Sequence, residues 1–446
     1  MARSSPVGLP AACSALFLCG GGTGGHVYPA LSVAAALAAV GKGERLIYVG
    51  SVGGMEEAIV ARESALPFRA LPAAALRGRG PIQMARGAAT MAAGTLAARA
   101  MIRELRPAAI LGTGGYVCVP LFLAARAMGV PTMIYLPDVV PGLAVKLLSR
   151  IATVTAVNVE DALPYLGVRS NQQRPSFVIT GYPVRAELFG QDRAACRKDF
   201  GLSEELPVAL VYGGSRGARS VNRAIAVLLP DLLARCQIIH VCGREGDEEW
   251  LREAAAGLSS EQQRRYKLYP YLDSGVGNGG RRQEAGSRKQ EAGSQDLGVG
   301  SREQVQETDT LPPASCLLPP ASCPSPPPMT RAFGAADLAI CRSGASTLAE
   351  LPAAALPAVL VPYPYVHQDE NADYLVRRGA AVKVSDATML GDGRPQDGDL
   401  AHEVIRLLEN TSERARMAEQ SRALARPDAA RHLAEILSRL ATRSGG

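Results

Sequence analysis

The chain is poor in aromatic side chains, and its cysteines follow no pairing pattern. Phe, Tyr and Trp make up 5% of the 446 residues, with a single tryptophan. The nine cysteines are odd in number and include no C-x-x-C pair, so their spacing indicates neither a zinc site nor a disulfide framework. We therefore expect the protein to work in a reducing cytoplasm.

Long apolar runs are missing too. Arg126 and several prolines interrupt the best candidates, and no stretch approaches the ~20 residues that a membrane-spanning helix needs. Residues 1–19 imitate a signal peptide, but cleavage would delete residues 15–19, the strand that we expect to precede a glycine-rich loop. Any membrane contact should therefore be peripheral. The net charge of +6 suits anionic partners such as phosphates and an anionic membrane face, and does not single out nucleic acid.

What is present is a repeated alternation of short apolar runs and longer helical patterns. It extends from residue 14 to residue 138 and begins again after a hinge near 181–190. Such alternation is the βαβ rhythm of a parallel sheet. A chain of 446 residues is also too long for one ordinary core. The sequence therefore predicts an α/β protein with two doubly wound halves.

The rhythm stops between residues 273 and 328. The composition there turns to Gly, Ser, Gln, Arg and Pro, with QEAGS at 283 and 290 and PPASC at 312 and 319. This segment has too few apolar residues to offset the entropy lost on ordering. We therefore expect a disordered low-complexity insertion.

Three glycine-rich turns stand where a strand should become a helix. The pattern G-x-G-x-x-G occupies 20–25, and turns of the same kind lie at 112–120 and 213–222. Exposed amides and a helix N-terminus attract phosphate at such positions. A dinucleotide site would also need an acidic residue at the end of the second strand, but that strand ends in Gly50 and Ser51, which argues against a dehydrogenase. Loops in both halves instead indicate a cleft that grips two phosphorylated molecules.

Seven motifs follow one another along the chain: GGTGGHVYPALSVA, YVGSVGGMEE, LGTGGYVCVP, GYPVR, GGSRGARSVN, CRSGASTLAEL and PYPYVHQDENADYL. In residues, order and approximate spacing they resemble the MurG family, the glycosyltransferases that add N-acetylglucosamine to lipid I in peptidoglycan synthesis. The resemblance covers nearly the whole chain except 273–328.

The resemblance implies a GT-B architecture, in which two Rossmann-like domains face a cleft. Residues 1–183 would form an acceptor domain that faces the membrane, and residues 184–427 a domain for the UDP-sugar. The C-terminal helix at 428–444 has an amphipathic pattern and could pack back on either half, the first domain included. The implied reaction is an inverting transfer of N-acetylglucosamine from UDP-GlcNAc to the muramyl 4-hydroxyl of lipid I, which forms lipid II. It would take place at the cytoplasmic face of the bacterial cell membrane, with the enzyme bound peripherally and without a cofactor.

Two alternatives remain open. One is a related GT-B transferase that acts on another lipid, such as diacylglycerol. The other is a sugar-nucleotide-binding homologue that has lost activity. A transfer assay with UDP-GlcNAc and a lipid I analogue separates them.

The resemblance also implies roles for single residues. The family's ribose-binding acid falls on Glu350, and its sugar-recognising glutamine on Gln368. Ser215 and Arg185 fall near the donor diphosphate, and Leu272 beside the uracil. The implied donor set is Thr23, Gly24, Gly25, Asp138, Arg185, Ser215, Leu272, Ala345, Ser346, Thr347, Leu348, Ala349, Glu350 and Gln368. The loops for the acceptor diphosphate comprise Gly22, Thr113, Gly114, Gly115 and Tyr116.

The residue chemistry permits bland readings beside these roles. Glu350 stands at an expected helix start, where a carboxylate can accept from both ribose hydroxyls or simply cap the helix. Gln368 can donate to and accept from sugar hydroxyls, but such a residue is also common in loops.

The chain departs from the family in one motif. Where the family usually has H-E-x-N before P-G-L-A, this sequence has Tyr135, Leu136, Pro137 and Asp138. An aspartate can accept a hydrogen bond from a sugar hydroxyl, but an ionised one cannot donate. The departure therefore puts the contact with the sugar or the acceptor in doubt.

His26 is the expected general base. An inverting transfer needs a group that takes the proton of the acceptor hydroxyl, and His26 stands where the first glycine loop becomes a helix. A helix N-terminus disfavours imidazolium, so we expect a neutral ring that accepts a proton. A capping or packing histidine is the alternative. No metal is expected, since the Asp-x-Asp pattern of Asp397 and Asp399 lies in a stretch that looks like a surface loop.

A lipid acceptor requires an approach to the bilayer. The segment 76–105 combines basic and apolar residues: Arg77, Arg79, Arg86, Ile82 and Met84. Each basic residue near an anionic surface contributes ~1 kcal/mol. We expect this segment to face the membrane, with a solvated loop and a packed helix as the alternative.

Overall fold

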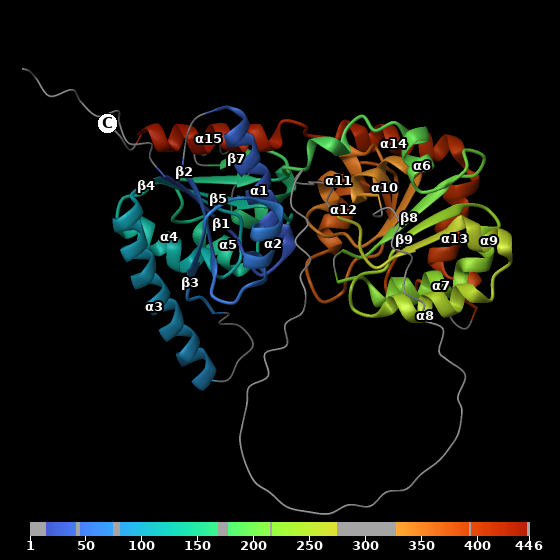
Figure 1. The fold of residues 1–446 in the computed structure, drawn as a ribbon, viewed down its shortest axis with the longest axis horizontal. Coiled ribbons are helices and arrows are strands. Elements are labelled where there is room, and N and C mark those ends of the chain that lie inside the picture. The colour runs from blue at the N-terminus through green and yellow to red at the C-terminus, as the bar shows by residue number, and fades with distance from the viewer. Residues whose placement is uncertain are drawn as a thin grey trace, which may run out of the picture.

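The computed structural model describes residues 15–41, 45–74, 81–167, 177–214, 216–273, 327–391 and 394–443. These residues form two parallel β-sheets, each covered by helices on both faces, which lie side by side (Figure 1). The predicted α/β class with two doubly wound, Rossmann-like halves is confirmed.

The N-terminal sheet has seven parallel strands in the order β3-β2-β1-β4-β5-β6-β7. Their bounds are β1 Ala15–Cys19, β2 Arg45–Ser51, β3 Phe68–Leu71, β4 Pro107–Gly112, β5 Thr132–Leu136, β6 Val154–Val157 and β7 Phe177–Ile179. The helices of this half are α1 Gly24–Ala39, α2 Met55–Glu63, α3 Pro81–Leu105, α4 Cys118–Ala127, α5 Leu143–Leu148, η1 Glu160–Ala162 and η2 Pro164–Leu166. The strand order reverses between β1 and β4, and ligands bind parallel sheets at such a switch point, beyond the carboxyl ends of the strands.

The C-terminal sheet has six parallel strands in the order β10-β9-β8-β11-β12-β13. Their bounds are β8 Val208–Tyr212, β9 Gln237–Val241, β10 Tyr266–Tyr269, β11 Leu338–Cys341, β12 Ala358–Leu360 and β13 Ala381–Lys383. The helices are η3 Ala186–Leu188, α6 Arg193–Asp199, α7 Arg219–Leu233, α8 Asp247–Ala256, α9 Ser260–Arg265, α10 Met329–Ala335, α11 Thr347–Ala353, α12 Asp369–Arg377, η4 Pro395–Asp397, α13 Asp399–Glu409, α14 Thr411–Ala423 and α15 Ala429–Arg443. Its switch point lies between β8 and β11.

Burial on both faces explains the strand sequences. Strand β1, ALFLC, and strand β8, VALVY, are buried along their whole length. Strands covered by helices on both sides read as continuous apolar runs rather than as an alternation of apolar and polar residues. Each sheet accordingly carries one apolar cluster on each face.

The last helix, α15, returns from the second half to the first. Leu433, Leu437 and Leu440 are buried in the apolar cluster that also contains Val33 of α1 and Leu111 of β4. Figure 1 shows this red helix above the N-terminal sheet, whereas α14, which precedes it in sequence, lies over the other half. The second half is therefore joined to the first by two crossings of the chain, one near residue 183 and one before α15.

The expected disordered insertion, 273–328, lies almost entirely outside the described residues. Its flanks are described, and they meet: the amide of Met329 donates to the carbonyl oxygen of Asp273 at 2.8 Å. The rest of the domain is therefore continuous across this point.

Candidate active site

The first glycine loop presents His26 at the end of β1. Thr23 is the N-cap of α1, and its hydroxyl lies 3.3 Å from Nδ1 of His26. The same Nδ1 lies 2.9 Å from the carbonyl oxygen of Gly21. A carbonyl oxygen only accepts, so Nδ1 carries the proton and Nε2 presents a lone pair. Nε2 makes no hydrogen bond to any described residue, which leaves it available as a proton acceptor.

The second glycine loop packs against this histidine. A Cβ on Gly114 would lie 2.6 Å from Cδ2 and 2.7 Å from Nε2 of His26. A Cβ on Gly115 would lie 2.4 Å from the carbonyl oxygen of Gly21. Both glycines also have positive φ, at +120° and +89°, which side-chain-bearing residues rarely adopt. The two loops thus touch each other, and only glycine fits where they meet.

The remaining members of the expected acceptor set have different surroundings. The hydroxyl of Thr113 is buried and donates to the main-chain oxygens of Cys19 and His26, so it braces the turn between the two loops. Gly22 and Tyr116 are exposed, and Tyr116 retains 49% of its accessible surface. The two glycine loops are therefore accessible to solvent at these two residues.

Glu56 is a residue of this site that sequence reasoning missed. Its carboxylate is fully buried under the first glycine loop and accepts from the Ser51 amide at 2.7 Å and from the Gly22 amide at 3.4 Å. An acid so placed needs hydrogen-bond donors around it. The available signal was its place in YVGSVGGMEE, two residues after the glycine pair, and we infer that it holds the loop in shape.

The third glycine loop, 213–217, lies beyond β8 in the C-terminal domain. Gly217 has φ +89°, and a Cβ there would lie 2.1 Å from the carbonyl oxygen of Cys242. Ser215 lies outside the described residues. Below the loop, Asn222 of α7 donates to the Cys242 oxygen and to Asp247, both at 2.8 Å. A buried polar network therefore fixes this loop.

The segment 343–350 follows β11 and carries Glu350 in the first turn of α11. Burial raises the pKa of the Glu350 carboxyl, and the charge of Arg185 and a hydrogen bond with Ser346 only partly offset this. Arg185 in turn lies over the ring of Tyr28 in α1, with 5.7 Å from its Cζ to the ring centroid. Glu350 and Arg185 are therefore close to the N-terminal domain as well as to each other.

The other expected residues of this segment mainly shape the turn. Thr347, Leu348 and Ala349 are buried, whereas Ala345 and Ser346 are half-buried. Ala345 and Ala349 pack against the apolar cluster of the N-terminal domain. The turn before α11 therefore forms part of the contact between the two domains.

Gln368 lies at the start of α12 with half of its amide already used. Its Oε1 accepts from the Tyr363 amide at 2.9 Å, and its main-chain oxygen accepts from the Ser343 hydroxyl at 2.7 Å. Its Nε2 makes no hydrogen bond to a described residue. The side chain is thus held with its two N–H donors available.

The side chains of Leu272 and Asp138 both contact other parts of the protein, Leu272 as a buried residue and Asp138 as a half-buried one. The side chain of Leu272 is buried in the apolar core of the C-terminal domain, so only its main chain is free to meet a nucleobase. Oδ1 of Asp138 accepts from Nδ2 of Asn371 at 2.9 Å, across the two domains. Burial raises the pKa of the Asp138 carboxyl, despite opposing effects of Asn371 and His26.

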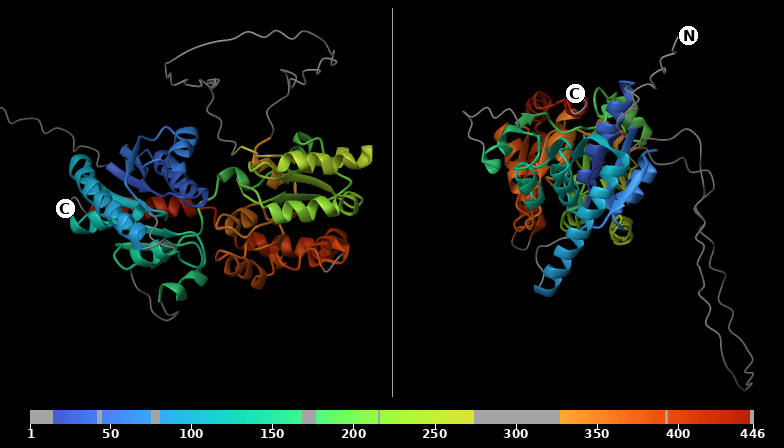
Figure 2. Two further views of the ribbon diagram at one scale, coloured as in Figure 1. Left: turned by 90° about the horizontal axis from the view of Figure 1, so that it is seen from below. Right: turned by 90° about the vertical axis from the view of Figure 1, so that its left-hand side faces the viewer.

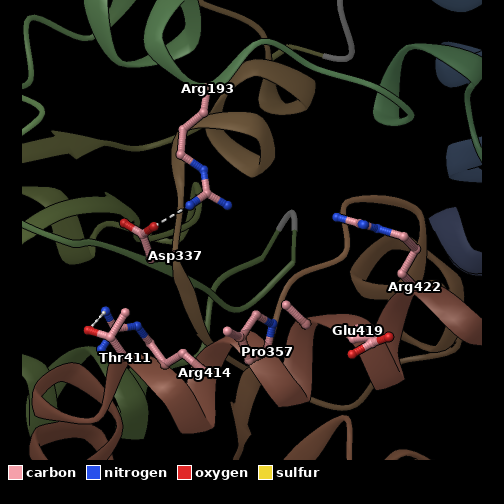
Figure 3. A pocket seen from close by; sticks show the side chains of 9 residues that line it. Arg193, Asp337, Pro357, Thr411, Arg414, Glu419 and Arg422 are labelled. Carbon is pink, nitrogen blue, oxygen red and sulfur yellow. Dashed lines mark hydrogen bonds and ion pairs between the residues drawn. The ribbon is translucent and has the colours of Figure 1, made fainter.

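A cavity of about 420 Å³ lies away from these residues (Figure 3). It is lined by Arg193 of α6, by Asp337 and Pro357 just before β11 and β12, and by Arg414 and Arg422 of α14. These positions are at the amino ends of the strands, whereas Glu350 and Gln368 follow the carboxyl ends. The cavity is therefore separate from the candidate active site.

Two family models match the chain. The glycosyltransferase family 28 N-terminal domain matches residues 16–157, and the glycosyltransferase family 28 C-terminal domain matches residues 322–433. The first contains the two loops around His26, and the second contains Glu350 and Gln368.

Individual relatives match over nearly their full length. A UDP-N-acetylglucosamine–N-acetylmuramyl-(pentapeptide) pyrophosphoryl-undecaprenol N-acetylglucosamine transferase of Roseiflexus sp. (strain RS-1) is 52% identical, over 98% of this chain and 97% of the relative. A protein of the same name from Desulforudis audaxviator is 34% identical, over 96% and 98%. The crystal structure of MurG from Acinetobacter baumannii superposes with a TM-score of 0.64 at 24% identity, over 96% of this chain and 99% of that one, and shows the same two-domain fold.

Proposed function

The chain belongs to the family of UDP-N-acetylglucosamine–N-acetylmuramyl-(pentapeptide) pyrophosphoryl-undecaprenol N-acetylglucosamine transferases, and from this we propose that it makes lipid II. It would move N-acetylglucosamine from UDP-GlcNAc to the 4-hydroxyl of the muramyl residue of lipid I, with inversion. The N-terminal domain binds the acceptor and the C-terminal domain binds the donor. The observation that carries this proposal is the environment of His26, a histidine with one nitrogen held by Gly21 and the other left as an acceptor between two glycine loops.

The proposed chemistry follows from that arrangement. Nε2 of His26 takes the proton of the muramyl hydroxyl while the hydroxyl oxygen forms a bond to the anomeric carbon. The bond from the anomeric carbon to the diphosphate breaks, and UDP leaves with the bonding electrons. Arg185 and the amides of the glycine loops stabilise the charge that develops on the diphosphate.

Donor recognition uses residues on the opposite wall. The half-buried Glu350 carboxylate accepts from the ribose hydroxyls, and Nε2 of Gln368 donates to the sugar. The main chain near Leu272 and the turn at 345–349 surround the nucleotide. Gly22, Gly114, Gly115 and the exposed Tyr116 line the way to the acceptor diphosphate, with Thr113 bracing them from below.

The lipid acceptor places helix α3 toward an anionic bilayer in this proposal. The helix extends beyond the rest of its domain, most clearly in the right-hand view of Figure 2. Arg86 is exposed on it, and so are Met84 and Leu96, at 51% and 68%. Arg77 and Arg79 lie outside the described residues. Of the helices that the structure describes, α3 included, none is long and apolar enough to cross a membrane.

A transfer assay tests the function. The protein is incubated with radiolabelled UDP-GlcNAc and a lipid I analogue, or with diacylglycerol in place of the analogue. We expect label in the disaccharide lipid only, formed about 10²- to 10⁴-fold more slowly by His26→Ala. Transfer to diacylglycerol would identify a transferase of another lipid, and retention of labelled donor without transfer would identify a binding protein.

A further inference from the structure

Helix α12 belongs to the C-terminal domain but bonds to the N-terminal domain near both of its ends. Near its start, Asn371 reaches the loop after β5. At its end, Arg377 and the following Arg378 reach the short helix η1, which follows β6. The loops after β5 and β6 lie at the same edge of the N-terminal sheet as the two glycine loops around His26. The helix therefore bridges the domains next to the candidate active site.

Asn371 uses both ends of its amide in this bridge. Its side chain is fully buried. Its Oδ1 accepts from the Val139 amide at 3.0 Å, and its Nδ2 donates to Oδ1 of Asp138 at 2.9 Å and to the Ser343 oxygen at 3.0 Å. Three bonds at fixed directions, two of them to the other domain, define one relative placement of these three segments.

Ion pairs repeat the contact at the far end of the helix. Asp161 accepts from Arg377 at 2.6 Å and from Arg378 at 2.8 Å, and Glu160 pairs with Arg378 as well. Burial alone would raise the pKa of Asp161, but the hydrogen bonds from Arg378 and Arg377 outweigh burial and lower it. The carboxylate therefore stays charged near neutral pH, and the pairs are intact.

Apolar packing fills the space between these two polar contacts. Val139 and Val159 of the N-terminal domain are buried in the same cluster as Ala372 and Leu375 of α12. Because the apolar packing and the polar contacts lie along the same helix, a shift of one domain against the other would disrupt the packing and the hydrogen bonds together. The contact is therefore specific in register.

The same helix begins directly after Gln368, and the two features are connected. The Ser343 hydroxyl donates to the main-chain oxygen of Gln368, while the main-chain oxygen of Ser343 accepts from Asn371. The donor-side amide and the contact with the N-terminal domain are thus two parts of one hydrogen-bonded unit.

We propose that α12 is the positioning element of this enzyme, with Asn371 and Arg378 as positioning residues that set the placement of Gln368 relative to His26. This inference rests on the proposed function. It gives Asp138 a role that differs from that of the family's asparagine, because the Asp138 carboxylate is the group of the N-terminal domain that accepts from Asn371. Groups that are misplaced by about 1 Å in such a site lose up to 10²-fold in rate.

The substitution Asn371→Asp tests the proposal with almost no change in shape. It replaces two N–H donors by an acceptor that faces the oxygens of Asp138 and Ser343. We expect kcat to fall by about 10- to 100-fold, with the Kd of UDP within about twofold, since Asn371 is not among the residues assigned to the donor. Adding Asp138→Asn restores a donor–acceptor pair between the two positions and should recover part of kcat.

Two further variants guard against a folding defect. Arg378→Ala removes its pairs with Glu160 and Asp161 at the far end of the helix, leaves the pair of Arg377 with Asp161, and should lower kcat with the Kd of UDP unchanged. Asp373→Ala is the matched control, because Asp373 lies on the same helix but pairs at 2.6 Å with Lys383 of its own domain. It should leave kcat unchanged.

A distance measurement tests the positioning without any activity. Fluorophores on bioorthogonal residues at the exposed Val40, the C-cap of α1, and Val227 of α7 report the separation of the domains. We expect Asn371→Asp and Arg378→Ala to broaden the distance distribution, and Asp373→Ala to leave it unchanged. If all variants give the same distribution, or if Asn371→Asp weakens UDP binding as much as kcat, the positioning role is wrong. If the wild-type protein transfers no sugar while Asn371→Asp and Arg378→Ala still broaden the distance distribution, the proposed function is wrong, but the role of α12 in domain placement stands.

Discussion

The imidazole of His26 packs directly on the Cα of Gly114. A Cβ at this glycine would lie 2.7 Å from Nε2, the nitrogen that we assign as the proton acceptor. The glycine also has φ +120°, a conformation that strains any other residue. The second glycine loop therefore sets the environment of the base as well as lining the acceptor site.

Gly114→Ala should accordingly reduce catalysis through His26. The added methyl group has to displace the ring or the loop, so we expect kcat to fall by about 10²-fold, with donor KM little changed. Gly129→Ala is a suitable control. That glycine also has positive φ, at +73°, but a Cβ there has nothing within 4 Å. Equal losses in the two variants would mean that backbone strain, and not the contact with His26, is responsible.

His26→Ala removes the proposed base itself. We expect kcat to fall by about 10²- to 10⁴-fold, the range for loss of a general base. Donor binding should be kept, because His26 is not among the residues assigned to the donor. Steady-state kinetics together with a UDP binding isotherm check both points. A near-normal kcat would leave His26 a structural residue and make Asp138 the next candidate for the base.

Glu350→Ala should raise donor KM by about 1.5 to 3 kcal/mol in free-energy terms, the scale of a hydrogen bond to a charged group. Burial raises the pKa of this carboxyl above its ordinary value of 4.5, although Arg185 opposes the shift. In the wild type, donor KM should therefore begin to rise at a pH above 4.5 as the pH is lowered, because the protonated carboxyl is a poorer acceptor. Glu350→Gln should lack this rise. An unchanged donor KM in a folded Glu350→Ala enzyme would remove the residue from the ribose site.

Gln368 should matter more to the hexose than to UDP. Since its Oε1 already accepts from the Tyr363 amide, Nε2 is the group assigned to the sugar. Gln368→Ala should raise the KM for UDP-GlcNAc and hardly change inhibition by UDP. Gln368→Glu retains the acceptor toward Tyr363 but loses the donors, and should behave in the same way. Equal loss of affinity for UDP and UDP-GlcNAc would contradict the assignment.

Replacement of residues 274–326 by a short Gly-Ser linker should leave a working enzyme. The flanks already meet through the bond between Met329 and Asp273, and each doubling of loop length costs only about 0.6 kcal/mol. We expect kcat and donor KM within a few-fold of the original, and loss of a protease-sensitive region. If the deletion unfolds the C-terminal domain or abolishes donor binding, the expectation of a disordered insertion is wrong.

The sequence by itself determined the local structure of this protein. The residues of β1 and β8 are apolar throughout because both faces of each sheet are covered, so these strands could be predicted from the sequence. The glycine loops could be predicted as well, because positive φ and close approach at residues such as Gly114 and Gly115 require glycine. The choice of His26 as the candidate base followed from its place between such a loop and a helix.

Only the tertiary structure decided which distant residues meet. Glu56 is an acidic residue, a type that is usually exposed. Its burial under the first glycine loop depends on how α2 packs. Asp138 accepts a hydrogen bond from Asn371, 233 residues away along the chain. Pairings over such separations depend on the placement of whole domains, which leaves no local periodicity or turn signal to read. The contact of α12 with the N-terminal domain could therefore not be predicted from a single sequence.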